Sequence, residues 1–456
     1  MPTLGRMTAD ESGLRDYIEA VRGLLAHGGF ERSGNAAEAA KWDIDHITRY
    51  LEAHGRPDAR HTIHVAGSKG KGSVATLAAS MLRAAGRHTL LLTSPDLHQS
   101  RERVAIDGAP IDYATYARHA RTLLDDPATV GWSYFELMTV LGWLAGAEAG
   151  CDWQVLEVGL GGRLDTTNAV QSKDVAVITA IDLEHTAILG DTIPQIAREK
   201  SGIIIGPCDV VAAPMRESAL DVVRARAHEM SATLHVVTEE CALRVVSESL
   251  EEQRFDLRTP HATYRGLRTS LVGPHQRENA ATAVRAAELA LEGAGEPISE
   301  AAVTRGLRDA RLPGRFEVLR RSPLLIVDGL HTPLAARRFR ETVEAVGVPR
   351  PRVLVVGMLA GRDIDAVARE LLGVTDTVIA APPASTRGAA ASAVAQAFSH
   401  LGGLAQTAPD VPAAIERARE VGGERASVLV VGSLYTVAEA REAVLGVTGD
   451  RALGLR

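Results

Sequence analysis

The stretch HVAGSKGKGS, residues His64 to Ser73, decides the fold because it joins two segments of different periodicity. The β-rich TIHVAG (62–67) overlaps its start, and VATLAASMLRAAG (74–86) after it has apolar residues at helical spacing. A second strand-like run, TLLLTSP (89–95), follows. This order predicts a βαβ unit whose glycine-rich turn directs free backbone N–H groups at an anion.

The residues of the turn fit a phosphate loop. Gly67, Gly70 and Gly72 let the backbone approach a phosphate and adopt positive φ angles that a β-carbon resists. Lys71 supplies a cation for the β and γ phosphates, and Ser73 supplies a hydroxyl near a metal ion. The sequence therefore predicts a binding site for a nucleoside triphosphate here.

The turn departs from the usual pattern G-x-x-x-x-G-K-[ST] at two positions. Val65 stands where the first glycine is expected, and Gly72 separates Lys71 from the hydroxyl residue. The alternative interpretation is an ordinary turn rich in Gly and Ser, with Lys69 and Lys71 as solvated lysines.

Outward from this turn, strand and helix patterns continue to alternate up to about residue 240. Buried strand-like runs are separated by amphipathic segments such as TIPQIAREKSGII (192–204). Alternation of this kind predicts an α/β fold: a P loop NTPase-like domain with a mostly parallel sheet covered by helices. Residues 242–272 have short strand patterns and predict a small antiparallel addition at the edge of that sheet.

A second alternation begins after ARLPGR (310–315). Its strand-like runs are PLLIVDGL, PRVLVVGML, DTVIAAPP and SVLVVGSLY. They predict a smaller, Rossmann-like α/β domain. Because Pro313 and Gly314 interrupt the helical pattern, we place the boundary there, with domains at 1–311 and 312–456.

Composition restricts the classes of function. The 456 residues carry 50 Lys and Arg against 57 Asp and Glu, a formal charge of -7, which argues against nucleic acid as a partner. Three widely spaced cysteines fit a reducing compartment. No apolar run approaches the ~20 residues of a membrane span. We expect a cytoplasmic monomer with small-molecule substrates and no contact with a membrane.

Two polar residues follow later strands of the predicted sheet. Glu157 lies at the end of WQVLEVGL and His185 after VAVITAID, at the sheet edge where α/β proteins gather their ligands. A carboxylate there can hold Mg²⁺ beside a triphosphate. Taken singly, Glu157 could equally be a buried, paired acid and His185 a hydrogen-bonded core residue. Since both share an edge with the phosphate loop, we favour a joint site.

At this point the chain resembles the folylpolyglutamate synthase and dihydrofolate synthase family of the Mur ligase superfamily. The resemblance extends from about residue 40 to residue 440 and rests on ordered blocks: GKGS, LEVGLGGRLDTTN, ITAIDLEHTAILGDTIPQIAREKSGII, GPHQRENAA, LPGRFEVL, VDGLH and VVGSLY. It implies an ATP- and Mg²⁺-dependent ligase that joins a folate or dihydropteroate carboxylate to L-glutamate through an acyl phosphate.

The resemblance also implies roles for individual residues. The ATP contacts are Gly67, Ser68, Gly70, Lys71, Gly72, Ser73, Asn279, Arg315, Asp328 and His331. The Mg²⁺ ligands are Ser94, Glu157, His185 and Lys200, the last as a carbamate. Lys71, His185 and Lys200 take the catalytic roles, and the pterin pocket falls on SYFE (133–136), notably Phe135, and on Leu164, Asp165 and Thr166. Without the resemblance, Lys200 reads as a solvated helix residue.

The chain departs from the family pattern at four positions. Ser68 and Lys69 replace the usual Thr and Asn, Asp96 replaces the His of SPHL, and Thr332 replaces an Asn. Lys69, Asp96 and Thr332 keep open the alternative of a nucleotide-binding relative without catalysis. A Mur-type ligase acting on another carboxylate is a further alternative. Against the peptidoglycan Mur ligases, Gly72 stands where their phosphate loop places Ser or Thr.

Overall fold

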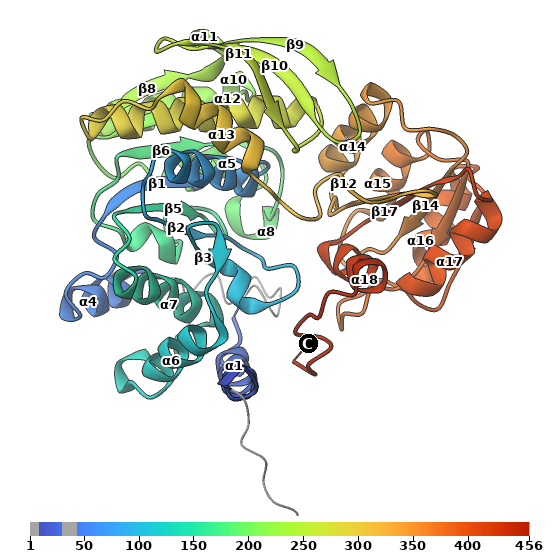
Figure 1. Ribbon diagram of the computed structural model, residues 1–456, viewed down its shortest axis with the longest axis horizontal. Coiled ribbons are helices and arrows are strands. Elements are labelled where there is room, and N and C mark those ends of the chain that lie inside the picture. The colour runs from blue at the N-terminus through green and yellow to red at the C-terminus, as the bar shows by residue number, and fades with distance from the viewer. Residues whose placement is uncertain (1–8, 30–42, 456) are drawn as a thin grey trace, which may run out of the picture.

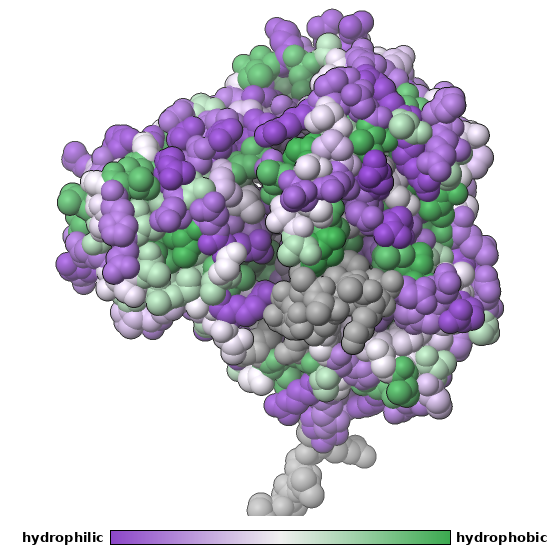
Figure 2. All heavy atoms as spheres, turned by 180° about the vertical axis from the view of Figure 1, so that it is seen from behind, coloured by the Kyte–Doolittle hydropathy of each residue, from purple (hydrophilic) through white to green (hydrophobic). Residues whose placement is uncertain are grey.

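A computed structural model describes residues 9–29 and 43–455 of the chain. They form two α/β domains side by side, with a small antiparallel sheet over the first (Figure 1). Seen from behind, hydrophilic and hydrophobic side chains intermingle over both domains (Figure 2). No helix in the described part of the chain is both long and apolar enough to cross a membrane.

The first domain is built on an eight-stranded sheet in the order β4-β3-β2-β5-β1-β6-β7-β8. Strands β2, β5, β1, β6, β7 and β8 pair in parallel, whereas β3 and β4 are antiparallel at one edge. The strand bounds are β1 His61–Ala66, β2 Thr89–Leu92, β3 Val104–Ile106, β4 Ala109–Pro110, β5 Trp153–Glu157, β6 Val175–Ile178, β7 Asp209–Ala212 and β8 Thr233–Val236. The mostly parallel sheet expected from the sequence is confirmed.

Helices cover both faces of this sheet, so its central strands are buried on both sides. One face packs against α5 (Lys71–Ala84), α12 (Pro274–Gly293) and α13 (Glu300–Asp309). The other packs against α1 (Ala9–Leu25), α4 (Asp45–Ala53), α6 (Tyr113–Leu124), α7 (Tyr134–Glu148), α9 (Ile193–Ser201) and α10 (Glu217–Glu229). Short helices α8 (Thr186–Leu189) and α11 (Val237–Glu240) lie in connections.

The antiparallel segment forms a sheet of its own. Strands β9 (Ala242–Glu248), β10 (Gln253–Arg258) and β11 (Thr263–Thr269) pair in the order β11-β10-β9. Phe255, Leu257 and Leu267 pack into the core beneath, against α5 and α12. The prediction that these strands extend the edge of the main sheet is therefore wrong. Their alternate residues bury one face against helices instead.

The second domain has a six-stranded sheet in the order β12-β13-β17-β14-β15-β16. All neighbours are parallel except β12 and β13. The strands are β12 Glu317–Arg321, β13 Leu324–Asp328, β14 Arg352–Val356, β15 Thr377–Ala380, β16 Ala405–Thr407 and β17 Ser427–Val431. Helices α14 (Pro333–Ala345), α15 (Ile364–Leu371) and α16 (Ala391–His400) cover one face, and α17 (Val411–Gly422) and α18 (Leu434–Leu445) the other.

Candidate active site

The phosphate loop lies between β1 and α5, as the sequence predicts. Gly67 has φ 147° and Gly70 has φ 94°, values that favour glycine. A β-carbon on Gly67 would stand 1.9 Å from Thr179 Oγ1, and one on Gly70 2.5 Å from Asn279 Oδ1. Both glycines are therefore required by backbone angle and by space. Asn279, predicted from the resemblance as a nucleotide contact, lies directly against the loop.

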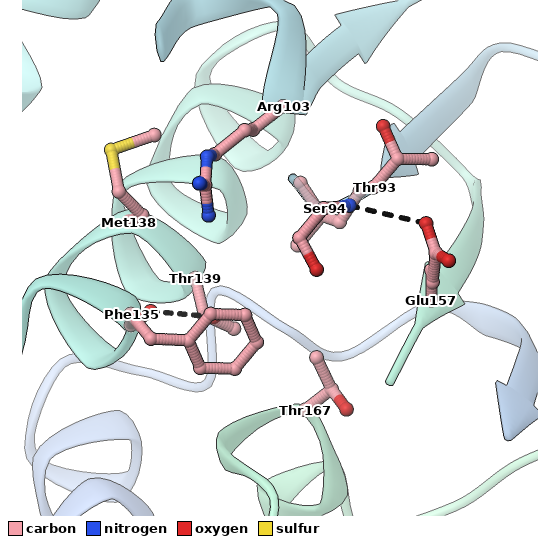
Figure 3. A pocket seen from close by; sticks show the side chains of 9 residues that line it. Thr93, Ser94, Arg103, Phe135, Met138, Thr139, Glu157 and Thr167 are labelled. Atoms are coloured by element: carbon pink, nitrogen blue, oxygen red, sulfur yellow. Dashed lines mark hydrogen bonds between the residues drawn. The ribbon is translucent and has the colours of Figure 1, made fainter. Parts of the chain in front are cut away.

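Glu157 ends β5 beside the phosphate loop. The β-carbon position of Gly72 lies 3.4 Å from both carboxylate oxygens of Glu157. The backbone N–H of Ser94 donates to Glu157 Oε2 at 3.1 Å, as Figure 3 shows. Burial raises the pKa of Glu157, and the charge of Lys71 acts against this shift. The acid, the glycine turn and Ser94 thus meet at one edge of the sheet.

His185 reaches the same edge from the connection after β6. It has φ 49°, a left-handed angle unusual for a residue with a β-carbon, immediately before α8. Burial lowers the pKa of His185 to about 4, and the charges of Lys200 and Lys71 act in the same direction. The imidazole is therefore neutral at physiological pH, which is the state that binds metal ions.

Lys200 is buried rather than solvated, so the solvated reading of this residue is wrong. It lies in the last turn of α9, whose start is fixed by a capping box between Thr192 and Gln195. Its Nζ donates to the carbonyl oxygen of Gly67 at 2.8 Å and to Glu184 Oε1 at 3.0 Å. Burial lowers the pKa of Lys200 to about 8.

Glu184 is a site residue that the sequence reasoning missed. One carboxylate oxygen pairs with Lys200 and the other with Lys69 Nζ, also at 3.0 Å. Burial alone would raise the pKa of Glu184, but the charges of Lys69, Lys200 and Lys71 hold it well below its usual range. Its position next to His185, after a buried strand, was the available signal. The pair with Glu184 also excludes the reading of Lys69 as a free surface lysine.

Lys71 begins α5, and the described residues give its ammonium one hydrogen bond, to the carbonyl oxygen of Gly67 at 3.1 Å. Its charge acts on Glu157, Glu184, His185 and Lys200. Lys71 is therefore at the centre of the cluster.

The second domain turns the carboxyl ends of its strands towards this cluster. Asp328 ends β13 and accepts from the backbone N–H of Phe316 at 2.8 Å; burial raises the pKa of Asp328, and Arg315 opposes the shift. Burial lowers the pKa of His331 to about 3, and the charge of Lys69 from the first domain lowers it further. Arg315 in turn acts on Glu157. Arg315 and His331 of the second domain therefore lie close enough to Glu157 and Lys69 of the first for their charges to interact.

Two arginines of the second domain were also missed. A β-bridge between Leu359 and Gly388 holds their two loops side by side. Burial lowers the pKa of Arg362, and the charge of Arg387 lowers it further. Arg362 acts on Glu184 and His185 across the domains. Among the described residues we find no hydrogen bond or ion pair of either guanidinium, nor of Arg315. Unpaired cations facing one site favour an anionic ligand.

A small cavity adjoins Ser94 and Glu157. Figure 3 shows the ring of Phe135, the guanidinium of Arg103 and the hydroxyl of Ser94 pointing into it, with Thr167 below. Its volume is about 20 Å³, room for one water molecule. The cavity as it stands is too small for a flat ring. Phe135 lines the cavity because Ser133 and Glu136 form the capping box that starts α7.

The other predicted pterin contacts lie behind this cavity. Asp165 accepts from Leu160 N at 2.9 Å and from the Thr167 hydroxyl at 2.5 Å, and so shapes the loop after β5. Thr167, rather than Thr166, lines the cavity. Direct substrate contacts of Leu164, Asp165 and Thr166 stay predictions.

The departures from the family pattern each find a local partner. Asp96 accepts from Arg103 Nε at 2.7 Å, so its negative charge is paired there. The Ser68 hydroxyl donates to the carbonyl oxygen of Asp182, and Thr332 caps the start of α14.

The residues present fit a magnesium ion bound together with a triphosphate. Among the described residues, no three His, Cys, Asp or Glu side chains gather into a metal-binding cluster. Mg²⁺ commonly takes only one or two protein oxygens and completes its shell with phosphate and water. Ser94 and Glu157 offer such oxygens, and neutral His185 adds a nitrogen. Lys200, as an ammonium, is a donor and not a ligand.

Comparison with known proteins defines the class. The family model "Mur ligase middle domain" matches residues 65–287, and "Mur ligase, glutamate ligase domain" matches residues 314–434. The Escherichia coli dihydrofolate synthase/folylpolyglutamate synthase is 34% identical over 382 residues, with 83% of this chain and 86% of that protein covered. The solved structure of Mycobacterium tuberculosis folylpolyglutamate synthase complexed with ADP superposes with a TM-score of 0.85 at 28% identity, covering 94% and 98% of the two chains.

The chain belongs to the folylpolyglutamate synthase/dihydrofolate synthase family, within the Mur ligases, as the sequence motifs predicted. A probable bifunctional folylpolyglutamate synthase/dihydropteroate synthase of Haloferax volcanii is 35% identical over 437 residues. That alignment covers 93% of this chain and 50% of the relative, so the chain spans about half the length of this protein.

Proposed function

We propose that this protein is an ATP-dependent ligase that forms an amide bond between the carboxylate of a folate or pteroate and the amino group of L-glutamate. The observation that carries the proposal is the meeting of the phosphate loop, Glu157 and His185 with arginines of the second domain that form no ion pair with a described residue. Family membership and the ADP complex of the mycobacterial relative support the choice of nucleotide.

The chemistry needs activation because a carboxylate and an ammonium do not condense in neutral water. A carboxylate oxygen of the acceptor attacks the γ-phosphorus of ATP, the bond to the β-phosphate oxygen breaks, and ADP leaves. The amine of glutamate, after losing a proton, attacks the acyl carbon and expels phosphate. Because such transfers depend on positioning and charge neutralisation, the loop N–H groups and Lys71 bind the phosphates.

Magnesium neutralises phosphate charge and orients the γ-phosphoryl group when it is bound. Ser94, Glu157 and His185 hold it in this proposal. Carbamylation of Lys200 converts its ammonium into an oxygen ligand, and the lowered pKa of Lys200 supports this because only the neutral amine reacts with CO₂. The carbamate on Lys200 places a second negative group beside Glu184, and the ammonium of Lys69, which pairs with Glu184, supplies a positive charge there.

The second domain completes the site. Asn279, Arg315, Asp328 and His331 contact the nucleotide as the family resemblance implies. Arg362 and Arg387 bind the carboxylates of L-glutamate, because two neighbouring guanidiniums that form no ion pair with a described residue match the two carboxylates of this substrate. We place the domain boundary in the linker at Pro313 and Gly314, and we propose that the protein works as a cytoplasmic monomer.

The test is ADP formation in the presence of ATP and Mg²⁺, with dihydropteroate, tetrahydrofolate or a UDP-muramoyl peptide, each with and without L-glutamate. We expect turnover only when a pterin acceptor and glutamate are both present. Turnover with the UDP-muramoyl peptide, and with neither pterin, identifies a Mur-type ligase for another carboxylate. ATP binding without turnover on any acceptor identifies a relative that has lost catalysis.

A further inference from the structure

The chain after α18 crosses from the second domain to the first. Residues 446–455, which we call the C-terminal strap, run beneath α18 towards α1 (Figure 1). Leu453 and Leu455 pack into the core formed by α1, α6 and α7 of the first domain. The strap therefore belongs by sequence to one domain and by packing to the other.

Asp450 is the polar anchor of the strap. Its side chain has no exposed surface, yet it carries a carboxylate. Tyr17 Oη donates to Asp450 Oδ1 at 2.8 Å, and both the backbone N–H and the hydroxyl of Ser100 donate to Asp450 Oδ2 at 2.9 Å. A buried carboxylate is costly unless it is satisfied by hydrogen bonds. These bonds thus fix the strap to one place on the first domain.

The strap and α18 contact the loop from Asp96 to Arg103, which we call the acceptor loop. His98 Nε2 accepts from Arg441 Nε of α18 at 3.1 Å. Gln99 Nε2 donates to the carbonyl oxygen of Thr448 at 3.1 Å, and the backbone N–H of Asp450 donates to the carbonyl oxygen of His98 at 2.8 Å. Leu97 packs against the core of the second domain. Successive residues of this first-domain loop are therefore held by the second domain.

The same loop supplies the cation of the acceptor cavity. Tyr134 Oη donates to Ser100 Oγ at 3.3 Å, and the guanidinium of Arg103 lies 5.0 Å from the centre of the Tyr134 ring. Arg103 reaches the cavity from the end of the acceptor loop (Figure 3). A chain of contacts thus runs from Asp450 through Ser100 and Tyr134 to Arg103.

We propose that Asp450 is a positioning residue for the acceptor substrate. Through Ser100 it fixes the acceptor loop, and with it the place of Arg103 opposite Phe135. The proposal rests on the proposed function, because it assigns the cavity to the acceptor. Its consequence is that recognition of a substrate bound by the first domain depends on a carboxylate supplied by the second.

The test compares Asp450→Asn with Asp410→Asn by steady-state kinetics. The amide has one acceptor oxygen where the carboxylate has two, so the donors of Tyr17 and Ser100 cannot all keep their bonds, and we expect the KM for the acceptor to rise about tenfold. The KM for ATP and the kcat should stay within about twofold, since the phosphate loop keeps its contacts. Asp410 caps α17 on the exposed side of the second domain and is the matched control, with unchanged acceptor KM.

A uniform loss of kcat with unchanged KM for the acceptor would overturn the proposal, as would an acceptor KM within twofold of wild type. If Asp450→Asn does not fold, Ser100→Ala replaces it, with an expected threefold rise in the same KM. Amide hydrogen exchange separates this proposal from the proposed function. Without substrate, Asp450→Asn should speed amide exchange at residues 96–103 but not at the phosphate loop. If the variant and the wild type exchange at the same rate at residues 96–103, the positioning role of Asp450 is refuted even if the enzyme is active.

Discussion

The two sheet edges on either side of the site are alike in topology but differ in how their cations are paired. On the first edge, Lys69 and Lys200 share the acid Glu184, so the cations are held in place before any ligand binds. On the second, the guanidiniums of Arg315, Arg362 and Arg387 form no hydrogen bond or ion pair with any described residue. The difference indicates that the first edge is preorganised for a triphosphate, whereas the cations of the second edge are neutralised only when an anionic substrate binds.

The largest expected effect on activity comes from removing the cation of the phosphate loop on the first edge. We expect Lys71→Ala to lower kcat by about 1,000-fold, about 4 kcal/mol, because the transferring phosphoryl group loses its main protein cation. Thermal melting should change little, because the lysine ammonium has one backbone hydrogen bond. Turnover within tenfold of wild type would show that this lysine does not contact the nucleotide.

Removing the shared acid tests whether the first edge is balanced in advance. Glu184→Gln leaves Lys200 buried without a countercharge, so we expect a loss of about 3 kcal/mol in the free energy of unfolding. Saturating ADP should reduce that loss, because its phosphates replace the missing negative charge. Glu199→Gln, which breaks an ion pair at the surface with Arg163, is the control and should cost less than about 1 kcal/mol. Equal losses in both variants, measured by denaturant titration, would contradict the comparison.

The second edge is tested by Arg362→Ala. We expect the KM for L-glutamate to rise by about 10- to 100-fold, about 1.4 to 2.8 kcal/mol, with the KM for ATP nearly unchanged. Arg369→Ala removes an exposed arginine from α15 in the same domain and should leave both constants unchanged. A rise in the KM for ATP alone would assign Arg362 to the nucleotide.

A smaller effect should come from Lys173, a buried lysine outside the site. It donates to Asn168 Oδ1 and to the carbonyl oxygen of Ile203, and burial lowers the pKa of Lys173 to about 7. Since the unfolded chain keeps this proton up to about pH 10.5, the unfolded state binds more protons between pH 7 and 10.5, and stability rises with pH there. Lys173→Met should remove about 1 to 2 kcal/mol of the rise between pH 7 and 9. An unchanged pH profile would show that the amine titrates normally.

The same two edges show what the sequence could and could not predict. Gly67, Glu157 and His185 were found because periodicity places each after a buried strand, and parallel strands end at one edge. Lys200 and Asn279 needed the family motifs, since nothing local distinguishes a buried lysine or a helix amide from solvated ones. The pairing of Glu184 with Lys69, and the lack of an ion pair between Arg362 and any described residue, depend on tertiary packing.

The antiparallel strands and the C-terminal strap show that contacts set by tertiary packing could not be predicted at the level of the fold either. The short strand patterns in residues 242–272 correctly indicated antiparallel strands, but not that these strands form a sheet of their own over the helices. Asp450 lies in a short stretch without periodicity, and its partners Tyr17 and Ser100 are remote in sequence. Such contacts are decided by the packing of whole domains.

The most direct test of the central claim follows the acceptor oxygen. An acceptor labelled with ¹⁸O in both carboxylate oxygens is incubated with ATP, Mg²⁺ and L-glutamate, and the inorganic phosphate is analysed by mass spectrometry. If the facing edges bring the γ-phosphoryl group to the acceptor carboxylate, each amide formed should release one phosphate carrying one ¹⁸O. Amide formation with unlabelled phosphate, or ADP release without any amide, would contradict the account.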